Sequence, residues 1–146
     1  MPSVVVGFDG KPTSEEAVRF AAHEAQMRSV TLRIVFVTHA HHLRGLSTQL
    51  GRGSTVSDVP MEKYAEDVAN SAAELARAVA PGVDVEIDVA DGDPATILTD
   101  MSHTALLLVV GTRRRGDVSA LVRSSVSHHV SQNAVCPIVI VPPAPG

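Results

Sequence analysis

The stretch LLVVGTRRRGDVSALVRSSVSHHVSQNAVCPIVIV, residues 107–141, decides the fold. It opens with an apolar run that stops at Gly111 and closes with a second apolar run, 138–141. A polar loop and a helix-like segment, from Ser124 to about residue 133, separate the two runs. Short continuous apolar runs are typical of strands buried on both faces. Two such runs joined through a helix predict a right-handed crossover between parallel strands.

Strand-like and helix-like segments alternate through the rest of the chain. The predicted strands are 3–8, 31–37, 83–89, 105–110 and 138–141, and the predicted helices begin near 14, 57, 94 and 124. Thr13 or Ser14 is expected to cap the first helix, with Glu15 and Glu16 in its first turn, and Asp93 is expected to cap the third. Strand 105–110 is the most apolar and is expected to be central, whereas 83–89 alternates Val or Ile with Asp or Glu and is expected near a sheet edge. This order predicts an α/β protein with helices on both faces of a parallel sheet.

In a sheet of this kind, ligands bind at the carboxyl ends of the strands, where the strand order switches direction. Three segments follow predicted strands and are therefore expected to border a site. They are Asp9–Thr13, the long polar stretch from Thr38, and Gly111–Ser127.

Composition limits the class of protein. A length of 146 residues predicts one domain, 1–146. Twelve basic against sixteen acidic residues give a net charge of −4, and only four residues are aromatic, so neither phosphate neutralisation nor base stacking favours nucleic-acid binding. Cys136 is the single cysteine, which excludes an intrachain disulfide. With no signal-like segment and no apolar run of membrane length, a soluble cytoplasmic protein is expected.

Three stretches together carry a family resemblance. VVVGFDGKPTSEEAVRFAAHEA near the N-terminus, GDPATIL at 92–98 and the stretch 107–141 resemble, in order and spacing, the universal stress protein family. The resemblance implies a flavodoxin-like sandwich with strand order 3-2-1-4-5. It also implies a stress-response homodimer, joined along strand 138–141, that acts by binding rather than as an enzyme, with an unidentified protein partner.

Members of that family that bind ATP carry Gly-x-x-Gly-x9-Gly-Ser/Thr after the fourth strand. Glycines there let the backbone approach a triphosphate, and exposed amides point at the anion. In this chain Gly111 holds the first glycine position, but Arg114 and Ser124 stand at the second and third, followed by Ser125. The nucleotide-site residues that the resemblance implies are Asp9, Val37, Gly111, Arg113, Arg114, Ser124, Ser125 and Val126.

Two hypotheses follow from the altered motif. In the favoured one, the loss of two glycines leaves ATP binding weak or absent. In the alternative, the Arg-rich loop 113–115 replaces the glycines, since arginine suits phosphate, and the protein is a true sensor of ATP or another adenine nucleotide. A slow ATP hydrolase is disfavoured because Asp117 is the sole candidate base in the motif region.

Histidine and cysteine offer other chemistry. His39, His41 and His42 could ligate a metal, but they lack an adjacent carboxylate or thiolate, so a tolerant polar loop is the preferred interpretation. Ser127 and its histidine neighbour point about 100° apart on a helix and are not expected to form a catalytic pair. Cys136 is expected to be a buried, inert thiol.

Overall fold

Five parallel strands form one sheet in the order β3-β2-β1-β4-β5. In the computed structural model of the chain, the residues described are 2–38, 61–112 and 126–145. The strands are β1 Ser3–Phe8, β2 Thr31–Thr38, β3 Val85–Asp91, β4 Leu107–Gly111 and β5 Ile138–Val141. The predicted flavodoxin-like order 3-2-1-4-5 is confirmed.

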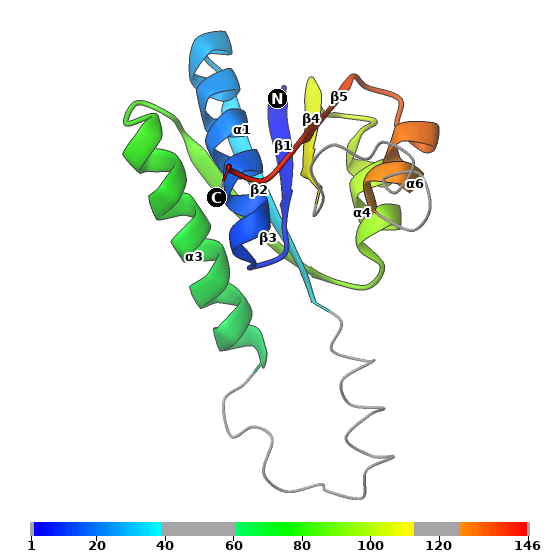
Figure 1. Cartoon of the computed structure of the whole chain (residues 1–146), viewed down its shortest axis with the longest axis horizontal. Coiled ribbons are helices and arrows are strands. Elements are labelled where there is room, and N and C mark those ends of the chain that lie inside the picture. The colour runs from blue at the N-terminus through cyan, green and yellow to red at the C-terminus, as the bar shows by residue number, and fades with distance from the viewer. Residues whose placement is uncertain (1, 39–60, 113–125, 146) are drawn as a thin grey trace, which may run out of the picture.

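Helices cover both faces of the sheet (Figure 1). The helix α1, Glu15–Arg28, and the helix α3, Met61–Val79, lie on one face. The helices α4, Pro94–Met101, and α6, Val126–Asn133, lie on the other. A short 3-10 helix η1, Pro12–Ser14, leads from β1 into α1. The starts predicted near 57 and 124 fall outside the described residues.

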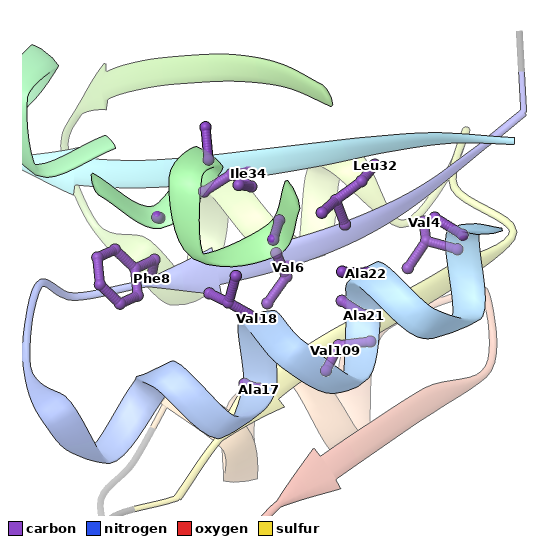
Figure 2. Packing of buried hydrophobic residues seen from close by; sticks show 14 of the residues in the cluster. Val4, Val6, Phe8, Ala17, Val18, Ala21, Ala22, Leu32, Ile34 and Val109 are labelled. Atoms are coloured by element: carbon purple, nitrogen blue, oxygen red, sulfur yellow. The ribbon is translucent and has the colours of Figure 1, made fainter. Parts of the chain in front are cut away.

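The sheet separates two apolar cores. Under α1 and α3, every second residue of β1 and β2 is buried against an alanine-rich helix face, as Figure 2 shows for Val4, Val6 and Phe8. Alanine has no side chain beyond Cβ, so α1 lies close to the sheet, and its alanines at 17, 21, 22 and 25 are fully buried. The second core joins the intervening strand residues, among them Val5 and Leu108, to α4 and α6.

Two of the predicted strand positions are corrected. The strand predicted at 83–89 is β3, 85–91, because the Val83 amide still donates to the Ala80 carbonyl (3.0 Å) in the turn that ends α3. Its expected place at the sheet edge is confirmed. The strand expected at the centre, β4, is buried but lies between β1 and β5, and β1 takes the middle position. It also begins later than predicted, at Leu107, so Leu106 remains 40% exposed.

The start of α4 is formed as the sequence predicts. Asp93 is the N-cap, its carboxylate accepts a hydrogen bond from the Thr96 amide (3.2 Å), and Pro94 takes the first helical position.

Within the described ranges, no helix is both long and apolar enough to cross a membrane.

Candidate functional site

The carboxyl ends of β1 and β4 lie side by side at the point where the strand order switches. The two strands pair in parallel, with Val6 opposite Val109. From β1 the chain continues toward β2 on one side of the sheet, and from β4 it continues toward β5 on the other. Connections that diverge from neighbouring strands leave room for a ligand between them. The structure thus places Asp9, which follows β1, and Gly111, which ends β4, at one edge.

Asp9 is held in a fixed turn. Its Oδ1 accepts hydrogen bonds from the Lys11 amide (2.9 Å) and from the Ser14 hydroxyl (2.8 Å). Gly10 adopts a φ of +83°, which glycine allows at no steric cost. Among the described residues, no hydrogen bond or ion pair reaches the second oxygen, Oδ2, and the residue is exposed. The turn therefore uses one carboxylate oxygen and leaves the other as an acceptor.

Ser14 has a different role from the predicted helix cap. It stands at the N-cap of α1, but its φ and ψ are helical and its side chain makes no capping hydrogen bond. The hydroxyl lies 2.8 Å from Asp9 Oδ1 and 3.0 Å from the Lys11 carbonyl, and the residue is only 6% exposed. Glu15 and Glu16 occupy the first turn of α1, where the positive end of the helix dipole stabilises their negative charge.

Gly111 is explained by contact with the chain itself. A Cβ added there would stand 3.3 Å from the Ser14 Cα and 3.5 Å from the Thr13 carbonyl oxygen. Both are backbone atoms, so the turn would have to shift to admit a side chain. In the family that the chain resembles, a glycine at this position lets the backbone approach a phosphate. The described geometry gives it an additional role, since it lets the turn that carries Ser14 and Asp9 pack against β4.

Val37 and Val126 lie near the same edge of the sheet. The β1–β2 ladder ends at the pair Phe8 and Phe36, so Asp9 and Val37 each follow the last paired residue. Val126 begins α6, and both valines are partly buried against the core under α4 and α6. The structure thus brings Asp9, Ser14, Val37 and Gly111 to one edge, and these four residues are called the carboxyl-edge site below.

Other predicted positions lie outside the described residues. They are Arg113, Arg114, Ser124 and Ser125 of the altered motif, and His39, His41 and His42. Within the part of the chain that the structure describes, no group of three His, Cys, Asp or Glu side chains is arranged to hold a metal ion.

A hollow on the surface between α3 and β3 is separate from the carboxyl-edge site. That hollow is lined by Glu66, Asn70, Ile87 and Val89, none of which belongs to the site. It is wide and open, whereas small-molecule sites usually enclose most of their ligand. The carboxyl-edge site is therefore the stronger candidate for ligand binding than this hollow.

Cys136 lies in the segment between α6 and β5 and is half-buried rather than fully buried as expected. Burial raises the pKa of its thiol, with backbone hydrogen bonds opposing the effect only in part. A raised pKa disfavours the reactive thiolate, which agrees with the inert role expected for this residue.

A doubly wound parallel sheet with a polar turn at its switch point defines a class of α/β proteins that bind ligands at the strand ends. Within that class, residues 1–142 match the model of the universal stress protein family, and the chain belongs to that family.

The matched relatives are longer than this chain. Universal stress protein Rv2623 of Mycobacterium tuberculosis is 33% identical over 140 residues, which cover 94% of this chain and 46% of the relative. Universal stress protein Rv3134c of the same organism is 29% identical over 143 residues, covering 98% and 49%. The chain therefore spans about half the length of the curated relatives it matches.

Solved structures of the family share the fold. A universal stress protein in complex with cAMP superimposes with a TM-score of 0.74 at 23% identity, covering 98% of each chain. The universal stress protein from Archaeoglobus fulgidus in complex with dAMP gives a TM-score of 0.67 at 21% identity, covering 97% of each chain. At these identities the likeness supports the architecture.

Proposed function

We propose that this protein is a stress-response protein that acts by binding, and that its carboxyl-edge site takes an adenine nucleoside monophosphate with weak or absent affinity for ATP. The observation that carries the proposal is the turn at Asp9, which fixes one carboxylate oxygen and leaves the other as an acceptor. A carboxylate accepts hydrogen bonds from hydroxyl and amino groups, both of which a nucleoside offers.

The number of phosphates on the ligand is inferred from two parts of the site, the end that would hold the nucleoside and the motif that would hold the phosphates. Asp9, which lies at the base or ribose end of the cleft in the nucleotide-binding proteins that the chain resembles, is present, and Val37 is adjacent to it in register. Two of the three motif glycines that would admit a triphosphate are replaced, by Arg114 and Ser124. The two structural neighbours named above hold cAMP and dAMP, each with a single phosphate. These observations favour a monophosphate over ATP.

A second candidate rests on residues 113–115, which are three consecutive arginines. Guanidinium groups bind phosphate oxygens in pairs, and three of them beside Gly111 would favour a ligand with more phosphates. In that case the protein is an ATP sensor.

The affinity order separates the two candidates. The favoured function predicts that AMP binds more tightly than Mg-ATP by at least about tenfold, which corresponds to about 1.4 kcal/mol. The sensor predicts the reverse order. Calorimetric titration of the parent chain with each nucleotide measures both affinities.

We further propose a homodimer formed along β5. All four β5 residues, Ile138–Val141, are partly exposed although each is apolar. An apolar edge strand presents unpaired backbone groups to another chain. The opposite edge strand, β3, carries Glu86 and Asp88, and charges of this kind protect an edge from pairing.

The proposal also includes a single domain over 1–146, a cytoplasmic location and an unidentified protein partner.

An acidic residue on β5 should dissociate this dimer. Val139→Asp or Ile140→Asp would place a charge in the paired strands, where burial of an unpaired charge is costly. Light scattering should then give the mass of one chain instead of two. Both side chains also touch a core, so circular dichroism must show an intact fold. The matched control, Val89→Asp on the opposite edge, should remain a dimer, and a dimer in all three variants would refute the β5 interface.

A further inference from the structure

We infer that Ser14 is a positioning residue for the nucleoside: its buried hydroxyl fixes Asp9 so that the free oxygen of that carboxylate meets the ligand. The inference rests on the proposed function, because it assigns the orientation of a group that the proposal uses. The family resemblance points to Asp9 but not to Ser14, and the sequence predicts either Thr13 or Ser14 as the cap of α1.

The contacts of Ser14 show why it suits this role. Its hydroxyl has one proton and two acceptors in reach, Asp9 Oδ1 at 2.8 Å and the Lys11 carbonyl at 3.0 Å. A carboxylate is the stronger acceptor because it is charged, so the proton goes to Asp9. Ser14 is only 6% exposed, so water has little access to replace this donor.

Gly111 keeps Ser14 in place from the other side. A Cβ atom added to Gly111 would lie only 3.3 Å from the Ser14 Cα, so the backbone of Ser14 leaves no room for a side chain there. The Ser14 backbone is thus packed against the end of β4, and its hydroxyl is packed toward β1. Asp9, Ser14 and Gly111 therefore form a continuous contact across the switch point between the two strands.

Loss of the Ser14 hydroxyl changes the carboxylate in a defined way. The Lys11 amide would remain as the sole described donor to Oδ1, and a single hydrogen bond allows the Asp9 side chain to occupy other rotamers. The productive orientation would then be populated only part of the time, and the apparent affinity falls in proportion to that population. We expect Ser14→Ala to weaken AMP binding about three- to tenfold.

A double-mutant cycle distinguishes positioning from a general structural effect. AMP affinity is measured calorimetrically for the parent, Ser14→Ala, Asp9→Ala and the double variant. If Ser14 acts through Asp9, Ser14→Ala has less than about a twofold effect in the Asp9→Ala background. An equal loss in both backgrounds, or no loss in either, overturns the inference.

Ser102→Ala is the matched control for the cycle. Ser102 is 1% exposed, and its hydroxyl accepts from the Val135 amide (3.1 Å) and donates to the Thr99 carbonyl, far from Asp9 in the fold. Loss of this buried hydroxyl should lower thermal stability but leave AMP affinity unchanged. A loss of affinity in Ser102→Ala equal to that in Ser14→Ala would assign the effect to stability and overturn the inference.

A measurement without nucleotide separates this inference from the proposed function. Coupling constants between the α and β protons of Asp9 report whether its side chain occupies one rotamer. A single rotamer is expected in the parent and in Ser102→Ala, and averaging is expected in Ser14→Ala. Unchanged couplings in Ser14→Ala overturn the inference. If the parent binds no AMP, the proposed function is refuted, and with it the use of Asp9 for a nucleoside. If its couplings are nevertheless fixed while those of Ser14→Ala are averaged, Ser14 still holds Asp9.

Discussion

Replacement of Asp9 with alanine should weaken AMP binding about 10- to 100-fold. A hydrogen bond to a charged group contributes about 1.5–3 kcal/mol, and each 1.4 kcal/mol changes an equilibrium constant about tenfold. Asp9 Oδ2 is the acceptor that the turn leaves free, so its removal deprives the nucleoside of this contact. Calorimetric titration of the parent and of Asp9→Ala with AMP measures the ratio of dissociation constants.

The control for this variant is Asp84→Ala. Asp84 precedes β3, at the amino-terminal end of the parallel strands, whereas Asp9 follows β1 at the carboxyl end. Both variants remove one negative charge, so a long-range effect on an anionic ligand is similar in the two. We expect Asp84→Ala to retain the parent affinity within about twofold. An Asp9→Ala variant that binds AMP as tightly as the parent, with its fold intact, would remove Asp9 from the site.

Restoration of the motif glycines should create or strengthen ATP binding. The double variant Arg114→Gly, Ser124→Gly places glycine at all three motif positions, with Gly111 already present. If the two replacements exclude the triphosphate, Mg-ATP affinity should rise at least about tenfold, because backbone amides can then approach the phosphates. The ATP-sensor function predicts the opposite, since the variant loses a guanidinium beside the phosphates.

A composition-matched variant controls for charge and flexibility. Arg115→Gly, Ser119→Gly makes the same two types of change in the same segment but at positions outside the motif. It should leave Mg-ATP affinity near that of the parent. Equal gains in both double variants would show that loss of a side chain anywhere in the segment suffices. No gain in the motif variant, with the fold intact, would refute the glycine-loss explanation.

The architecture was predictable because its signals are local. Continuous apolar runs such as Ser3–Phe8 mark strands buried on both faces, and the strand order observed agrees with the family resemblance. The acid-apolar alternation near Val85 placed β3 at the edge correctly. The two-residue error in its bounds arose because Val83 is apolar but still belongs to the turn after α3. Apolar character did not show whether β1 or β4 takes the middle position of the sheet, because both strands are buried.

The carboxyl-edge site was predictable only in part. Asp9 and Gly111 were identified by resemblance, and the topology alone would have indicated their segments. The role of Ser14 was missed because a serine directly before Glu15 and Glu16 has the pattern of a helix cap. The contact between Ser14 and Gly111 joins residues far apart in the sequence, and no local pattern reports such a contact. The hydrogen bond between Ser14 and Asp9 does have a local signal, an acid followed five residues later by serine across a glycine turn.

The central claim is that the carboxyl-edge site takes an adenine monophosphate and disfavours ATP, and the most direct test is titration of the parent chain with AMP and with Mg-ATP. Tyr64 is the only Tyr and there is no Trp, so absorbance near 260 nm first shows whether nucleotide remains bound after purification. We predict saturable AMP binding at one site per chain, with Mg-ATP weaker by at least about tenfold or not detected. Tighter binding of Mg-ATP than of AMP, or no binding of either nucleotide, would contradict the account.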